Sequence, residues 1–188
     1  MRPALWLGAV GSVLAALLLQ RTGTFSAHMA AHLLLSLLTP PLLLAALGWR
    51  PRVPVWLGFV ALNAVTVGVH LPGVYPRLMA SPALSLLEGL AFALSGLLFW
   101  SAARRGGWAT VGLMGVQMAA CALLGAAITF SRGVYPGSGD DVALGGVLMW
   151  VAGGAVYMGW GMVSFMRALH LSETPRLPEA PRAVPEAM

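Results

Sequence analysis

The sequence contains no lysine, a single cysteine and only six acidic residues among 188. Cys121 lies inside an apolar run, so neither an internal disulfide nor a cysteine-pair metal site can form. Charged residues make up 9% of the chain, against about 25% in an average soluble domain, and are too few to cover a soluble core. A hydrophobic content of 59% excludes a disordered chain. Long uncharged runs and a mean hydropathy of +0.82 instead predict a polytopic membrane protein.

All eleven basic residues are arginine, and they give the chain a net charge of +5. They are spread over the loops rather than gathered on one face, which excludes nucleic acid as a partner. Most fall on one side of the expected membrane: Arg2, Arg50, Arg52, Arg104, Arg105, Arg167, Arg176 and Arg182. The other side has Arg21, Arg77 and Arg132. Because cytoplasmic loops carry the excess of positive charge, both termini are predicted to be cytoplasmic.

Apolar segments separated by Arg, Pro and Gly predict an all-α fold, a bundle of six transmembrane helices. The expected spans are 3–20, 26–48, 54–71, 83–103, 108–130 and 142–166. The loops are short, so consecutive helices should be antiparallel neighbours in one bundle, residues 1–171. The first span is interpreted as an uncleaved helix rather than a signal peptide, because no convincing cleavage site follows it directly. Residues 172–188, rich in Pro and Glu, are predicted to be a disordered C-terminal tail.

Three features of these spans are interpreted as structural. Pro40-Pro41 should kink the second span and free backbone carbonyls there, and the glycines of the last span should allow close helix approach. Methionines at helical spacing are predicted to fill gaps between helices. They are Met114 and Met118 in the fifth span, and Met158, Met162 and Met166 in the sixth.

Ionisable residues at membrane depth lie close to the outer ends of the predicted helices. They are His28, His32, His70, Glu88, Asp140 and Asp141. Burying such groups in a bilayer is costly, so an intramembrane ionisable residue is a functional candidate. Their gathering on one side of the bilayer, with none at comparable depth on the other, predicts a shared site.

The histidines suggest a metal site. His28 and His32 are spaced i, i+4, which puts both rings on one helix face. Two imidazoles so placed can bind a transition metal together with a ligand from another helix. His70, followed by Pro72, could supply that ligand at the end of the third span. The alternative is that all three are interfacial histidines hydrogen-bonded to loop carbonyls.

The acidic residues have structural and chemical interpretations. One of Asp140 and Asp141 is expected to cap the last helix, while the other either accepts a hydrogen bond from a histidine or offers an oxygen to a metal. Glu88 lies too far into its helix to be a cap and should be paired with a histidine or with Arg77. Met29 is a copper candidate because it follows His28, and Met149 is the other methionine within reach of the outer half.

A short repeat occurs in two outward loops. Gly-Val-Tyr-Pro follows the third span at 73–76 and the fifth span at 133–136. Such a segment can place an aromatic side chain at the membrane interface and end a helix. Convergent loop chemistry and a duplicated helical hairpin both account for it.

Several segments, in order along residues 25–160, resemble the CtaG-type cytochrome c oxidase assembly proteins. They are FSAHMAAHLL at 25–34 with TPPLL at 39–43, HLPGVY at 70–75, LE at 87–88 with LFW at 98–100, and DVALGGVLMW at 141–150. The family pattern usually has histidines where this chain has Ser85 and Gly89. It usually has glutamines where this chain has Val142 and Ala143.

The resemblance implies a non-catalytic assembly factor in the bacterial cytoplasmic membrane. Its partners would be subunits of cytochrome c oxidase, within membrane lipid, and a homo-oligomer stays an open alternative. The implied cargo is copper, handled at the outer face of the membrane. Carried over position by position, the metal residues would be His28, His32, His70, Glu88 and Asp141. No nucleophile–base pair is apparent, so an enzyme is not expected.

Two other functions stay open at this point. The chain could be a structural accessory subunit of a respiratory complex, its polar cluster serving only helix packing. It could also be a b-type haem protein, which would need two histidines facing each other across a wide gap.

Overall fold

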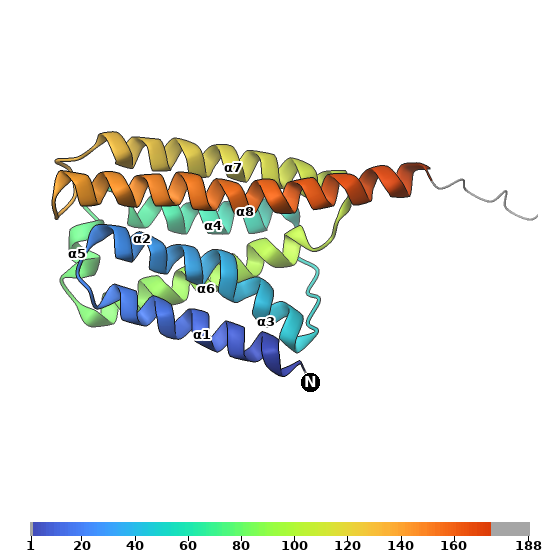
Figure 1. The fold of residues 1–188 in the computed structure, drawn as a ribbon, viewed down its shortest axis with the longest axis horizontal. Coiled ribbons are helices and arrows are strands. Elements are labelled where there is room, and N and C mark those ends of the chain that lie inside the picture. Colours follow the sequence, from blue (N-terminus) through green and yellow to red (C-terminus); the bar gives the residue numbers. More distant parts are fainter. Residues whose placement is uncertain (1, 174–188) are drawn as a thin grey trace, which may run out of the picture.

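The structure is a computed structural model that describes residues 2–173, and within that part of the chain every regular element is helical (Figure 1). The elements are α1 (Pro3–Gln20), α2 (Phe25–Leu33), the π-helical η1 (Leu34–Leu38), α3 (Thr39–Leu47), α4 (Val55–Val69), α5 (Tyr75–Met79), α6 (Pro82–Ala103), α7 (Gly107–Phe130) and α8 (Gly139–Glu173). The all-helical prediction is confirmed. The last helix is longer than predicted at both ends, so Ser172 and Glu173 of the predicted tail are helical; the rest of that tail lies outside the described residues.

Among the residues that the structure describes, five helical stretches are long and apolar enough to cross a membrane, which identifies a multi-pass membrane protein. They are Pro3–Gln20, Phe25–Leu47, Pro82–Ala103, Gly107–Phe130 and Gly139–Ser172. The helix α4 is also apolar but has only 15 residues. The long helices run side by side, and the start of α1 lies at the same end of the bundle as the end of α8 (Figure 1).

The predicted irregularity at Pro40-Pro41 takes the form of a π-helical turn, η1, joining α2 to α3. Pro40 has no N–H, so the carbonyl of Ser36, four residues earlier, has no helical donor. The indole Nε1 of Trp100 in α6 donates to that carbonyl at 2.9 Å. The prediction that proline frees a carbonyl is therefore confirmed, and the freed group holds α6 against the second span.

Glycines let the helices around α2 approach closely. A Cβ at Gly145 of α8 would lie 2.5 Å from the ring of Phe25, and one at Gly96 of α6 would lie 2.7 Å from the Ser36 carbonyl oxygen. Gly146 packs on α7 in the same way. Close approach through the glycines of α8 is confirmed at Gly145, Gly146 and Gly153, whereas Gly154 and Gly159 face open space. The second span is thus held between α6 and α8.

The methionine stripes differ from each other. Met114 is buried in the core, as predicted. Met158, Met162 and Met166 are more than half exposed, so the prediction that they fill gaps between helices is wrong. They lie on the outer surface of α8, because any face of a membrane helix can carry apolar side chains.

Candidate metal centre

The start of α2 is held by two hydrogen-bonding side chains. Thr24 accepts from the backbone N–H of Ala27. Asp141 of α8 accepts from the backbone N–H of Phe25 at 2.6 Å and from both the N–H and the hydroxyl of Ser26. These are N–H groups that a helix leaves without internal partners. Asp141 therefore caps a helix other than its own and fixes the position of the turn that follows.

The other acidic residue of the pair has a different partner. Asp140 forms an exposed ion pair with Arg132 at 3.0 Å. The hydroxyl of Ser138 accepts from the backbone N–H of Asp141 and so takes part of the capping role expected of an aspartate. Neither aspartate lies in the group of closely spaced donor atoms described next.

His28, His32 and Glu88 form a buried cluster between α2 and α6, termed here the histidine–glutamate cluster. The Nε2 atoms of both histidines lie 3.3 Å from Oε1 of Glu88. One ligand atom from each residue falls within 4.8 Å of the others. The rings of His28 and His32 stand 4.2 Å apart, as the i, i+4 spacing predicts. The expected pairing of Glu88 with a histidine is confirmed.

Several polar atoms of the histidine–glutamate cluster lack hydrogen bonds. Neither ring nitrogen of His32 has a hydrogen-bond partner, and neither does Oε2 of Glu88. The approach of His32 to Glu88 is close in distance but not oriented as a hydrogen bond. Buried polar atoms without partners are costly. A bound cation would take one ring nitrogen of His32 as a ligand together with the carboxylate of Glu88, whose charge it would neutralise, so these residues fit a metal ion.

His70 lies beside the cluster and faces a sulfur atom. Its ring is 5.5 Å from that of His32. Its Nδ1 donates to the carbonyl of Thr66 at 2.6 Å, and its Nε2 lies 3.0 Å from Sδ of Met29. Since a carbonyl can only accept, Nδ1 carries the proton, and in the neutral ring Nε2 presents its lone pair to the sulfur. Two electron-pair donors then face each other, which suits a soft cation between them.

Aromatic side chains enclose the cluster. Phe92, one helical turn beyond Glu88, stacks on His32 at 3.9 Å. Tyr75 and Tyr135, from the two Gly-Val-Tyr-Pro loops, are buried in contact with each other and with Phe25. The hydroxyl of Tyr135 donates to the carbonyl of His70. The repeated tyrosines are thus buried beside the site rather than exposed on the surface.

Both tyrosines stay neutral in this setting. Burial raises the pKa of Tyr75 well above its usual value, and the carboxylates of Glu88 and Asp141 raise it further. Burial also raises the pKa of Tyr135. Their hydroxyls therefore add no charge beside the histidine–glutamate cluster at neutral pH.

An open cavity of about 630 Å³ reaches His28 from the end of the bundle where α5 lies. Tyr75, Met79 and Ser85 are among its lining residues. Gly89, the other position where the resembled family pattern has histidine, instead packs near Gln20, whose amide nitrogen is buried without a partner. The cavity gives a route by which an ion could reach the cluster.

A second, small cavity of about 30 Å³ lies on the other side of His32. Met29, Cys121 and Met149 contribute sulfur-bearing side chains to its wall. The Cys121 thiol donates to the carbonyl of Met149 at 3.1 Å. Met149 therefore lines the same cavity as His32.

The predicted site residues are thus partly brought together. His28, His32 and Glu88 converge, His70 lies against His32, and Asp141 acts through the backbone of Phe25 and Ser26. Sequence reasoning missed Phe92 and Thr66 as supporting residues. Their i+4 and i−4 spacings from Glu88 and His70 were the available signal.

The fold and this site define a multi-pass helical membrane protein with a buried histidine–glutamate cluster near one end of its bundle. The family model of the cytochrome c oxidase caa3 assembly factor (Caa3_CtaG) matches residues 49–170, about two thirds of the chain. The chain belongs to this family, as the resemblance predicted. The match includes His70, Glu88 and Asp141, while His28 and His32 precede it. No curated protein and no solved structure gave a match.

Proposed function

We propose that the protein binds copper as cargo in the histidine–glutamate cluster and supplies it during assembly of cytochrome c oxidase. The observation that carries this proposal is the set of unpartnered, buried nitrogen and oxygen atoms at His32 and Glu88. Family membership connects the chain with assembly of the oxidase. It also favours a non-catalytic role.

The donor types support copper over other metals. Imidazole nitrogens suit copper and zinc, whereas a thioether sulfur is a ligand for Cu(I). Met29 and His70 place one donor of each kind 3.0 Å apart beside the cluster. A monovalent ion would also balance the single charge of Glu88 when the histidines are neutral. His28, His32, Glu88, His70 and Met29 are therefore the proposed copper residues.

Asp141 is proposed as a positioning residue rather than a ligand. Its two oxygens accept three hydrogen bonds from Phe25 and Ser26. Holding the first turn of α2 fixes the ring of His28, which follows in the same turn. Groups that orient metal ligands in this way contribute to affinity without touching the metal.

The proposed topology puts the site at the outer face of the bacterial cytoplasmic membrane. It takes α4 as a sixth crossing and assigns both termini to the cytoplasm, as the arginine distribution favours. The open cavity beside His28 would then face outward. A reporter fused after Met188 is expected to be active only in its cytoplasmic form; activity of a periplasmic reporter would contradict this orientation.

The experiment that tests the function compares cells with and without the protein. Without it, we expect oxidase activity to fall while oxidase subunits are still made, and excess copper in the medium to restore part of the activity. Activity and the copper content of the isolated oxidase are the two measurements. A purely structural accessory subunit predicts that copper has no effect, and unchanged oxidase activity would contradict both roles.

A further inference from the structure

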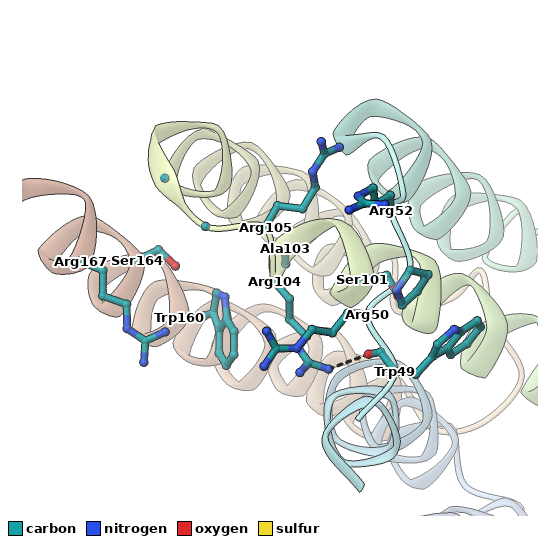
Figure 2. A pocket seen from close by; sticks show the side chains of 13 residues that line it. Trp49, Arg50, Arg52, Ser101, Ala103, Arg104, Arg105, Trp160, Ser164 and Arg167 are labelled. Atoms are coloured by element: carbon teal, nitrogen blue, oxygen red, sulfur yellow. Dashed lines mark hydrogen bonds between the residues drawn. The ribbon is translucent and has the colours of Figure 1, made fainter. Parts of the chain in front are cut away.

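A further pocket lies at the end of the bundle opposite the histidine–glutamate cluster. It has a volume of about 450 Å³ and is formed by the segment between α3 and α4, the turn between α6 and α7, and α8 (Figure 2). We call it the basic pocket. Its arginines are Arg50, Arg52, Arg104, Arg105 and Arg167, and its other labelled residues include Trp49, Trp160, Ser101 and Ser164.

Among the side chains that the structure describes, the arginines of the basic pocket have no acidic partner. Arg104 donates to the backbone carbonyl of Trp49, and Arg105 donates to that of Val53, both at 3.3 Å. Among the described side chains, those of Arg50, Arg52 and Arg167 form neither a hydrogen bond nor an ion pair.

Three of the four acidic residues within 2–173 lie far from the basic pocket. Glu88, Asp140 and Asp141 belong to the opposite end of the bundle, where they contact α2 or Arg132. The fourth, Glu173, is the last residue of α8. The positive-inside rule accounts for arginines on this side of the membrane, but not for their gathering around one cavity. Five like charges so placed repel one another until an anion joins them.

Exposed tryptophans indicate the level in the membrane at which the basic pocket lies. Trp49, Trp56 and Trp108 are each more than half exposed, and all three lie at the helix ends that surround it. Exposed tryptophans of membrane proteins gather at the level of the lipid headgroups. The pocket is therefore at the depth where phosphate groups of the bilayer lie.

The hydrogen-bond donors of the basic pocket match a phosphate group as ligand. Guanidinium groups match phosphate oxygens with paired N–H donors. The helix α7 begins at Gly107, which lines the pocket, so the positive end of its dipole adds to the field there. Basic pockets between membrane helices are suited to phospholipid headgroups.

We propose that the basic pocket binds a phosphate group, and that its source is the headgroup of an anionic phospholipid. The site is separate from the proposed copper site and does not depend on it. Its occupant would tie the α3–α4 segment, the α6–α7 turn and α8 together at this end of the bundle.

The test is native mass spectrometry of the full-length protein in detergent, with phosphatidylglycerol and phosphatidylcholine of the same acyl chains as probes. One phosphatidylglycerol is expected to bind more tightly than phosphatidylcholine. Arg50→Gln combined with Arg167→Gln should weaken that binding about 10- to 30-fold, because each arginine near a lipid phosphate contributes about one kcal/mol. Neither guanidinium group forms a hydrogen bond with another described residue, so the fold should be retained.

The matched control is Arg21→Gln combined with Arg77→Gln, which removes the same charge from exposed positions at the other end. It should leave lipid binding unchanged. Equal affinity for the two lipids, or an equal loss in both double variants, would overturn the proposal. Inorganic phosphate forms a third arm: if it displaces phosphatidylglycerol at low millimolar concentration, the site serves soluble phosphate and the lipid source is wrong. The lipid comparison needs no variant, so it stands even where a variant fails to fold.

Discussion

Replacing His32 by alanine is expected to abolish copper binding and to lower oxidase activity to that of cells lacking the protein. His32 is buried, lies 3.3 Å from Glu88, and has two ring nitrogens without hydrogen-bond partners. Loss of a residue that only orients a metal ligand costs about 10- to 100-fold in metal affinity, so loss of a ligand should cost more. Copper per purified chain and oxidase activity in membranes are the measurements.

The matched control is His170→Ala, which makes the same substitution in α8 at the other end of the bundle. It should leave copper binding and oxidase activity unchanged. Because His32 stacks on Phe92, its loss also removes packing. Glu88→Gln serves as a second variant, since it keeps the side chain's size and removes its charge. Normal copper content in both site variants, at normal protein levels, would show that these residues only pack helices.

Replacing Gly96 by alanine is expected to destabilise the protein and disturb the copper site at the same time. A Cβ there would lie 2.7 Å from the Ser36 carbonyl oxygen and 2.8 Å from Pro40 Cγ. Because backbone atoms and a proline ring cannot turn aside as a flexible side chain can, α6 must move away from the second span. Overpacking of this kind costs about 1–3 kcal/mol. Thermal unfolding and the yield of folded protein in membranes measure the effect.

Gly159→Ala in α8 makes the same change where nothing lies within 4 Å of the new Cβ. It should be neutral or slightly stabilising, since alanine favours a helix more than glycine does. The displacement of α6 by Gly96→Ala should also pull Glu88 from the histidines and weaken copper binding in whatever protein folds. Equal stability of the two variants would contradict the close packing of α6 on η1.

The helices and the core of the site could be predicted from the sequence because both follow from the cost of exposing polar groups to lipid. Uninterrupted apolar runs located the long helices to within a few residues, apart from the ends of α8, whereas the short helix α5 lies in an expected loop. His28, His32 and Glu88 were identified because charged groups are rare at membrane depth. Their spacing and helix-end positions then indicated that they face one another.

The role of Asp141 could not be predicted, because it depends on how two helices pack. Its position before an apolar run indicates a cap on α8, which is the local arrangement. In the fold, Gly145 lets α8 approach Phe25 so closely that Asp141 reaches the N–H groups of α2 instead. Ser138 is then left to cap α8. A tertiary contact has replaced the local one.

Which methionines are buried could not be predicted from the sequence either. In a soluble helix, an apolar stripe faces the core, because the other face must be polar. A membrane helix has no such contrast, since lipid accepts apolar side chains on every face. Met114 and Met162 therefore look alike in sequence, although one is buried and the other is exposed. For Tyr75 and Tyr135 the sequence suggested exposure at the membrane interface, but both side chains are buried beside the site.

The most direct measurement is X-ray absorption at the copper edge of the purified protein loaded with Cu(I). The account predicts one copper per chain, ligated by nitrogen or oxygen atoms together with a single sulfur that disappears in Met29→Leu. Glu88→Gln should bind copper weakly. Protein that takes up no copper, or copper bound by sulfur alone and unaffected by Glu88→Gln, would contradict a copper site in the histidine–glutamate cluster.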